Sequence, residues 1–412
     1  MKGRKEEMIY KNKGITLVAL VITIVILIIL ATVTINAVLG ENGLIKKAEE
    51  AKEMAEEATK NEEEGINNLL QEYTNIVGDP TEQEPTKIAD VTRNKVFTRT
   101  TKISDASGKI LYVPGGFGIA TDSPNEIDDG IVITNEGNTK QFVWIPVDDE
   151  SLAEMYNTTG EEKTLTGVTT KTNIYSNLRV RIGDNYTTTT PGDILKDRGI
   201  REPDVLSGYD TDEQYYKTIL GYTNIGAMAD AMVEEYNATY ESIQKYDGFY
   251  IGRFEITGTV ENPTVEKGKD VITNQNWYNL KKACTNVVSS SYAQSTMIYG
   301  NQWDEVMNWL IETEEKTDSE VNSDSSSWGN YATDIKRTSG YSESWKANNV
   351  YDLAGNCGEW TQEANYRYAR IGRGGSFQIS MSKNDKASIR NTHGTYHNEY
   401  NDLSSRPTLY IK

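Results

Sequence analysis

The sequence predicts an α+β protein in which a long N-terminal helix precedes a region of short strands, helices and loops. Residues 15–40 carry no charged side chain, as expected for one long apolar helix. From about residue 141, short apolar runs alternate with stretches rich in Asn, Asp, Gly, Ser and Thr. Residues 296–313 place large apolar side chains at helical spacing. We therefore expect an irregular C-terminal domain rather than a regular barrel or sandwich.

The overall charge restricts the partners. The 412 residues include 61 Asp and Glu against 42 Lys and Arg, a formal net charge of -19. Nucleic acids and anionic lipid surfaces require clustered basic side chains, so we expect no nucleic acid partner. The charge suits a soluble extracellular domain that resists aggregation. Cys284 and Cys357 leave two interpretations open, one disulfide or two separately buried thiols.

The apolar segment of residues 15–40 predicts a transmembrane helix. At about 1.5 Å per residue it spans the roughly 30 Å hydrocarbon core of a bilayer. It lacks the polar stripe of a buried amphipathic helix. Basic side chains outnumber acidic ones in residues 1–14, a basic leader that the positive-inside rule places in the cytoplasm. The predicted localisation is a single-pass cell-membrane protein with an extracellular C-terminal domain.

The junction between Gly14 and Ile15 resembles the leader of type IV prepilins. In that family prepilin peptidase cuts after the glycine, so the resemblance implies processing between Gly14 and Ile15. It covers about residues 11–73. The family usually has Glu at the fifth position after the cut, where this chain has Ala19, and this departure weakens an assignment to a filament. A plain membrane anchor is the alternative.

Composition divides the rest of the chain. Residues 41–77 place apolar side chains at helical spacing among many Glu and Lys, which predicts a helical stalk. Residues 78–105 contain prolines among polar side chains, as in an extended linker. Residues 106–140 form a small β segment with strands expected at 109–113 and 130–133. In the C-terminal domain, residues 141–412, we expect strands at 141–146 and 248–256.

Four segments of the C-terminal domain resemble signatures of the formylglycine-generating enzyme (sulfatase-modifying factor) family. In chain order they are residues 248–257, 350–361, 373–377 and 405–412. The resemblance implies a C-type-lectin-like fold for this domain. Glycines such as Gly355 and Gly374 are expected where a Cβ would clash, and Trp144 and Trp360 are expected in the core.

The same resemblance implies a Ca²⁺ site without copper. In the family, the segment that matches residues 354–359 holds Ca²⁺ through backbone carbonyls and one carboxylate, hard oxygen ligands that suit this ion. The corresponding ligands here are the carbonyls of Ala354, Gly355 and Cys357 and the side chain of Glu359. The alternative is that Glu359 only caps backbone amides. The family's catalytic cysteine pair is absent, since residues 378–412 contain no Cys, so we expect neither copper nor catalysis.

Residues 378–405 are dominated by Asn, Ser, Tyr, His, Asp and Thr. In a C-type-lectin-like fold this region belongs to the exposed ligand-binding face, and these side chains make adaptable polar and ring contacts. The predicted ligand-binding residues are Gln378, Ser380, Ser382, Asn384, Asp385, Asn391, His393, Tyr396, His397, Asn398, Tyr400, Asn401 and Asp402.

This composition also resembles that of the variable proteins of diversity-generating retroelements, which use the same fold. Mutation at template adenines converts Asn codons into Tyr, Ser, His, Asp, Thr and Ile codons, and these residue types are frequent here. Ordinary loop composition explains the same residues, and both interpretations stay open.

Together these features favour a cell-surface anchored, non-catalytic display or adhesion protein that binds an extracellular protein or glycan. Two alternatives are a minor pilin or pilus-tip adhesin, and an oxidoreductase of the formylglycine-generating type.

Overall fold

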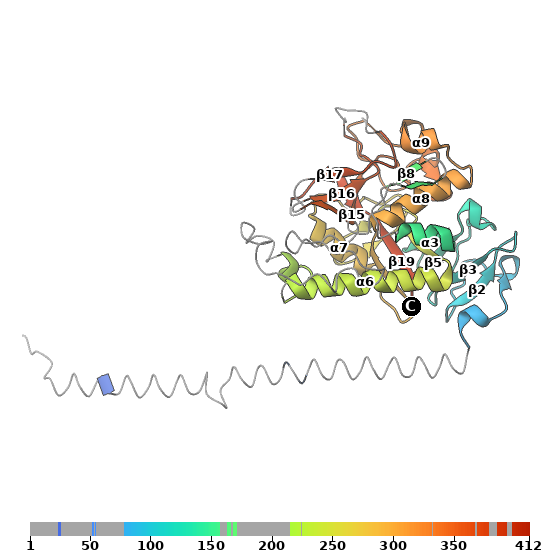
Figure 1. Ribbon diagram of the computed structural model, residues 1–412, viewed down its shortest axis with the longest axis horizontal. Helices are drawn as coiled ribbons and strands as arrows, with labels where there is room; N and C mark the ends of the chain where they lie inside the picture. Colours follow the sequence, from blue (N-terminus) through green and yellow to red (C-terminus); the bar gives the residue numbers. More distant parts are fainter. Residues whose placement is uncertain are drawn as a thin grey trace, which may run out of the picture. The chain divides into compact units, whose positions relative to one another are not determined.

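The computed structural model describes residues 24–25, 52, 54, 78–156, 163–165, 168–170, 215–223, 225–331, 333–366, 369–378, 385–393 and 398–412. The chain divides into two compact units, Met1–Asp79 and Pro80–Lys412. The second unit holds nearly all of the described residues and is drawn in colour in Figure 1.

The predicted fold class and localisation need correction. Within the described ranges, no helix combines the length and the apolar character needed to cross a membrane. The longest described helix, α6 (Ile225–Tyr246), has 22 residues. It is amphipathic, because Met228 and Met232 are buried while Glu234 and Glu241 are exposed. The described architecture is built from β-sheets and packed amphipathic helices, not from a long transmembrane and stalk helix.

Most residues of the predicted N-terminal features lie outside the described residues. The processing residues Gly14 and Ile15 lie outside them, and so do the segments 15–40 and 41–77 apart from four residues. Those four, at positions 24, 25, 52 and 54, are helical.

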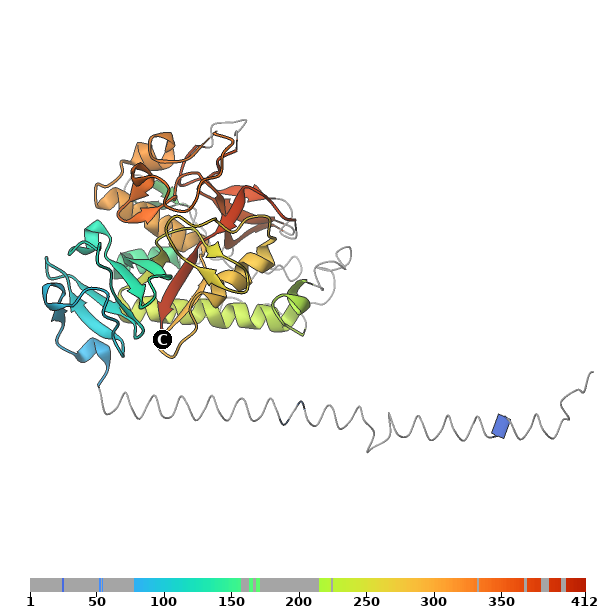
Figure 2. The same ribbon diagram turned by 180° about the vertical axis from the view of Figure 1, so that it is seen from behind.

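A six-stranded sheet forms the centre of the second unit. Its strand order is β12-β19-β9-β6-β5-β4, and every neighbouring pair is antiparallel. The strands are β4 (Phe117–Ile119), β5 (Val132–Asn135), β6 (Gln141–Pro146), β9 (Gly248–Gly252), β12 (Ala293–Met297) and β19 (Pro407–Ile411). Figure 2 shows the final strand, in red, running to the C-terminus through the middle of the unit. The last residues of the chain are thus part of its core.

The expected strands at 130–133, 141–146 and 248–256 are confirmed as β5, β6 and β9, with shifted ends for β5 and β9. β5 and β6 are neighbours in this sheet, so the expected boundary at residue 140 falls in the turn between two paired strands. The expected strand at 109–113 is β3 (Ile110–Val113), which belongs to a separate three-stranded sheet with β1 (Thr86–Lys87) and β2 (Thr101–Ser104).

Five of the described helices cover the central sheet or pack beside it. α6 packs on β9 and β19, and α7 (Trp277–Asn286) packs on β12 (Figure 1). α3 (Asp149–Met155) packs on α8 (Gly300–Glu312), and α9 (Asp318–Asn322) follows α8. The helix expected at 296–313 is therefore α8, but it begins at Gly300 because the residues before it complete β12. The Gln302 side-chain oxygen accepts the Tyr299 N–H at 3.1 Å at the start of α8.

A second, four-stranded sheet carries the C-terminal motifs. Its order is β17-β16-β15-β18, with β15 and β18 parallel and the other pairs antiparallel. The strands are β15 (Gly358–Tyr366), β16 (Ala369–Arg373), β17 (Asn391–His393) and β18 (Leu403–Ser405). Short two-stranded ladders complete the described elements: β7 (Lys163–Leu165) with β8 (Val168–Thr170), β10 (Thr257–Gly258) with β11 (Pro263–Thr264), and β13 (Lys346–Ala347) with β14 (Val350–Tyr351).

The motif glycines and tryptophans take the roles expected of them. Trp144 and Trp360 are fully buried. Gly355 has a φ of +72°, and a Cβ there would lie 2.4 Å from the carbonyl oxygen of Asn330. Side chains other than hydrogen are excluded at such a position by both strain and contact. The tight turn that this glycine permits packs on Asn330, whose N–H donates to the carbonyl of Ala354 at 3.2 Å and whose carbonyl accepts the Asn356 N–H at 2.9 Å.

Candidate ligand-binding site

Residues from the two ends of the predicted ligand-binding segment, together with Ser376 just before it, form a polar cluster. The Gln378 side-chain amide donates to Oδ1 of Asn401 at 3.0 Å, and the Ser376 hydroxyl donates to Oδ2 of Asp402 at 3.1 Å. Asn401 is exposed, and the other three are half-buried. We call these four residues, together with Tyr400, the C-terminal face.

The backbone under the C-terminal face is held from two sides. Gly358 N–H, at the start of β15, donates to the carbonyl of Asp402 at 2.8 Å. Asn274 N–H, just before α7, donates to the carbonyl of Tyr400 at 2.8 Å. The Tyr400 ring also meets the ring of Trp360 edge-on, with centroids 6.1 Å apart. The cluster is therefore presented on a fixed support, the arrangement in which surface residues serve recognition.

Other predicted residues lie apart from this face. The backbone carbonyl of Asp385 accepts the Ser325 N–H at 2.6 Å. Asn391 is exposed at the start of β17, and His393 ends the same strand opposite Arg370. Asn398 is exposed just before Tyr400. Ser380, Ser382, Asn384, Tyr396 and His397 lie outside the described residues.

The middle of the predicted segment is structural. Ala387 is fully buried, where its N–H donates to the Ser325 hydroxyl at 2.8 Å and its carbonyl accepts the Trp303 indole N–H at 3.0 Å. Arg390 pairs with Glu363 at 2.7 Å and with Asp304 at 2.5 Å. This anchor was not predicted from the sequence. The alternation of Ala387 and Ile389 within a polar stretch was the signal for it.

Arg390 completes a buried charge cluster between the second sheet and α8. Arg373, fully buried in β16, binds Oδ1 of Asp304 at 2.7 Å, while Arg390 takes the other oxygen. Burial alone would raise the pKa of Asp304, but the two guanidinium groups outweigh it and lower that pKa. The cluster thus holds a charged aspartate and fastens residues 385–390 to the core.

The contacts of the predicted Ca²⁺ ligands do not fit a cation site. Glu359 is fully buried and its carboxylate binds Arg406, with Nη2 to Oε1 at 2.6 Å. The carbonyl of Ala354 accepts the Asn330 N–H at 3.2 Å. Throughout the described ranges, no group of three or more His, Cys, Asp or Glu side chains is arranged to hold a metal ion. Ca²⁺ binding by Ala354, Gly355, Cys357 and Glu359 stays a prediction without support from these contacts.

The backbone N–H of Cys357, within residues 354–359, donates to Glu255 and not to Glu359. Glu255, after β9, accepts the Cys357 N–H at 2.9 Å and the Asn356 side-chain amide at 2.6 Å. Glu359, for which capping was the alternative, instead neutralises an arginine. Three of the four family-like segments therefore meet through Glu255, Glu359 and Arg406.

Both cysteines are free and buried. Burial raises the pKa of Cys284 to about 12 and raises the pKa of Cys357 well above its usual value. Thiols with such pKa values stay protonated at neutral pH, and the protonated form is neither a good nucleophile nor a metal ligand.

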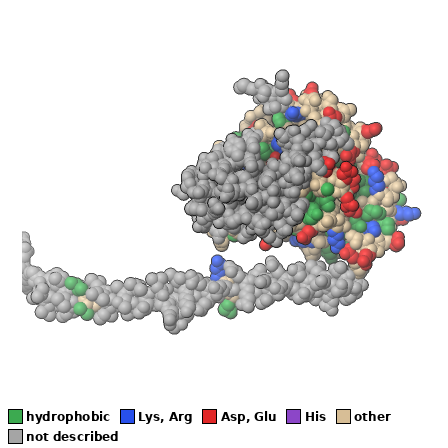
Figure 3. Space-filling model, viewed as in Figure 1, with side chains coloured by type: hydrophobic (Ala, Val, Ile, Leu, Met, Phe, Trp, Pro, Cys, Tyr) green, Lys and Arg blue, Asp and Glu red, His purple; other side chains and the backbone are tan. Residues whose placement is uncertain are grey.

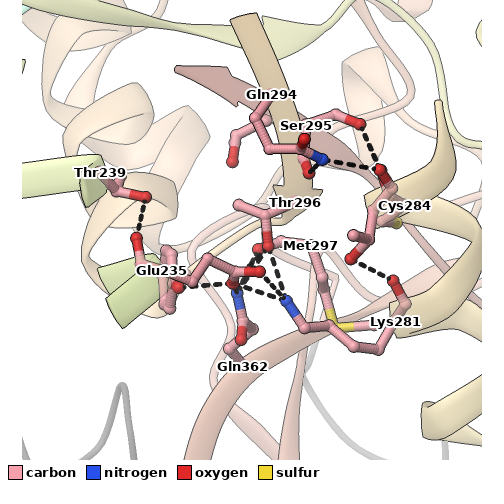
Figure 4. A network of polar contacts seen from close by, with 12 residues as sticks. Glu235, Thr239, Lys281, Cys284, Gln294, Ser295, Thr296, Met297 and Gln362 are labelled. Carbon is pink, nitrogen blue, oxygen red and sulfur yellow. Dashed lines mark hydrogen bonds and ion pairs between the residues drawn. The ribbon is translucent and has the colours of Figure 1, made fainter. Parts of the chain in front are cut away.

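A second polar centre lies between α6, α7 and the central sheet (Figure 4). Lys281 of α7 binds both carboxylate oxygens of Glu235 of α6, at 2.6 and 2.7 Å, and the Thr296 hydroxyl at 2.7 Å. Gln362 of β15 donates to the same carboxylate at 2.9 Å. Burial would raise the pKa of Glu235, but Lys281 and the hydrogen bonds lower it. Here too the helices are joined to the sheet by a satisfied buried charge.

Comparison with known proteins gives little sequence support for any family. No protein-family model matches the chain, and no curated protein matches it. Among solved structures, the crystal structure of CarF is 14% identical with a TM-score of 0.29, and covers 40% of this chain and 87% of its own. Variable protein 1 of Treponema denticola is 12% identical with a TM-score of 0.24, and covers 75% of this chain and 98% of its own.

The second of these proteins is by its name a variable protein, the class that the C-terminal composition resembles. The prepilin and formylglycine-generating resemblances have no counterpart in these comparisons. With TM-scores this low, neither likeness carries an argument about function.

Proposed function

We propose that this chain is a non-catalytic ligand-binding protein and that its C-terminal face binds a protein or a glycan. The observation that carries the proposal is the pairing of Gln378 with Asn401 above the backbone support at Asp402 and Tyr400. It joins exposed and half-buried polar groups from two chain segments on one rigid base. Such a surface retains donors and acceptors for a partner without the entropy cost of ordering a mobile loop.

The chemistry of the face suits hydroxyl-rich or amide-rich ligands. Two side-chain amides and one hydroxyl provide donors and acceptors, and Tyr400 adds a half-buried ring. Acidic side chains are spread over the visible described surface in Figure 3, and the formal net charge is -19. Repulsion disfavours strongly anionic ligands, so neutral glycans and neutral or basic protein surfaces are the favoured classes.

The state of the cysteines supports the non-catalytic part of the proposal. Copper-dependent thiol oxidation needs thiolates that reach solvent or metal. Cys284 and Cys357 are both buried, with pKa values that burial raises.

The test is binding of the purified full-length chain to arrays of printed glycans and purified proteins. The triple variant Gln378→Ala/Asn398→Ala/Asn401→Ala removes polar groups from the face and its edge without touching the buried support. Its affinity for the array ligands is expected to fall by about tenfold or more. A matched double variant, Gln244→Ala/Asn262→Ala, removes exposed polar side chains elsewhere and is expected to bind like wild type.

Two outcomes would overturn the proposal. If the triple variant binds its ligands as tightly as wild type does, the face is misassigned. If the wild-type chain binds nothing on either array, ligand binding itself is rejected.

A further inference from the structure

A cavity of about 190 Å³ lies between α6, α7 and residues 219–222. It is separate from the C-terminal face. Its lining residues are Ile219, Leu220, Tyr222, Met228, Met232, Glu235, Trp277, Lys281, Lys282, Thr285 and Asn286. Asn286 is exposed and Thr285 is half-buried, so this side of the cavity reaches the surface.

The walls are mostly apolar. Met228, Met232 and Trp277 are buried and supply thioether and indole surfaces. Methionine side chains adapt to flat apolar bodies and contact aromatic rings favourably. A cavity of roughly 150 Å³ accommodates benzene, so this one suits a single ring or a short aliphatic chain.

The charged pair at the cavity, Glu235 and Lys281, is already satisfied. The three donors of the Lys281 ammonium are used by the two Glu235 oxygens and the Thr296 hydroxyl. Oε1 of Glu235 also accepts from Thr296, Tyr299 and Gln362, at 2.6, 2.7 and 2.9 Å. This pair therefore shapes the cavity and offers little net charge to a ligand.

Lys282 is different from its neighbour. It is half-buried, lines the cavity, and makes no hydrogen bond or ion pair with any residue that the structure describes. Thr285 also lines the cavity. Its hydroxyl donates to the Lys281 carbonyl at 2.9 Å, and this bond does not use the hydroxyl's acceptor lone pairs. An ammonium group with three unused donors next to an apolar cavity complements one anionic group on an apolar body.

We propose that this cavity binds a small monocarboxylate with an apolar body, the body between Met228, Met232 and Trp277 and the carboxylate on Lys282. We assign an anionic group to the ligand because Lys282 is the charged cavity residue without a partner among the described residues. Glu235, the acidic residue of the cavity, already accepts hydrogen bonds from several donors.

The test is calorimetric titration of the purified full-length chain with three probes of one shape: phenylacetate, phenylacetamide and phenethylamine. Phenylacetate is expected to bind, and phenylacetamide to bind about tenfold more weakly, because a charged hydrogen bond is replaced by a neutral one. Phenethylamine is expected to give no heat of binding. Lys282→Met should remove the preference for the acid over the amide, and Lys282→Arg should keep it.

Two further variants complete the design. Met232→Trp fills the cavity and is expected to abolish binding of all three probes, with cooperative thermal unfolding as the check on folding. Lys87→Met removes an exposed lysine far along the chain and should bind phenylacetate like wild type. The proposal is overturned if phenethylamine binds more tightly than phenylacetate, which would make Glu235 the recognition group. It is also overturned if no probe binds the wild-type chain, or if Lys282→Met leaves the acid preference unchanged.

Discussion

Arg406 and Glu359 form a fully buried ion pair, with Nη2 of the arginine 2.6 Å from Oε1 of the glutamate. The same guanidinium donates to the carbonyls of Gly252 at 2.9 Å and Tyr351 at 2.8 Å. One side chain at the start of the final strand thus joins β9, β14 and β15 to β19. The chain's last residues hold together segments that lie far apart in the sequence.

The first prediction concerns this pair. Arg406→Met is expected to lower the free energy of unfolding by about 3–5 kcal/mol, because it leaves buried carboxylates without their cation. The measurement is urea denaturation of the full-length chain. Lys109→Met, which breaks the exposed pair with Asp128, is the control and should cost less than about 1 kcal/mol. Equal costs for the two variants would contradict the role given to Arg406.

The second prediction concerns pH. Burial raises the pKa of Asp352 from 3.8 to about 7, and one of its oxygens, Oδ1, has no hydrogen-bond partner. Between these two pKa values the folded chain binds more protons at this site than the unfolded chain does. The site's contribution to stability is therefore present at acidic pH and is lost as pH rises through about 7.

Unfolding free energies measured from pH 5 to pH 8 should show this loss. Asp352→Asn cannot titrate and is expected to flatten the decline relative to wild type. Both chains contain the groups with lowered pKa values, such as Glu235 and Asp304, so their contributions to the pH dependence cancel in the comparison. The contributions of these two groups to stability are lost at lower pH. Parallel curves for the two chains would rule the assignment out.

The third prediction concerns the network in Figure 4. Lys281→Met leaves Glu235 buried without its cation and is expected to cost about 3–5 kcal/mol of unfolding free energy. The double variant Lys281→Met/Glu235→Gln removes both charges and should be more stable than the Lys281→Met variant. A double-mutant cycle from chemical denaturation gives the coupling energy. A coupling energy near zero would show that the pair does not act as a unit.

The fourth prediction joins the anchor at Arg390 to the diversification hypothesis. Deep sequencing of the gene's 3′ end within one lineage is expected to find substitutions at codons for the half-buried residue 378 and for exposed residues such as 391, 398 and 401. Codons 387 and 390 should stay invariant, because Ala387 is fully buried and Arg390 neutralises Asp304 and Glu363. Substitutions that trace to adenines in a nearby near-copy would identify a diversified binder. An invariant 3′ end without such a copy would contradict diversification and favour ordinary loop composition.

Several elements followed from local sequence. Strand β6 was predicted from a short apolar run that ends at a proline, and strand β9 from an aromatic run that starts at a glycine. Helix α8 was predicted from its tryptophans at helical spacing, although its start was not. Helix α6 was missed, yet the spacing of Met228, Met232 and Tyr236 was a signal for it. Because α6 was not predicted, the cavity beside it was not predicted either.

What the sequence by itself determined were these periodicities, the buried tryptophans and the tight turn at Gly355. They depend on the backbone preferences and polarity of neighbouring residues. Only the tertiary structure decided that β19 lies between β9 and β12, that Glu359 pairs with Arg406, and that Lys282, which has no partner among the described residues, lines a cavity. The partner of a buried charge comes from packing between distant segments, and no local pattern encodes that choice.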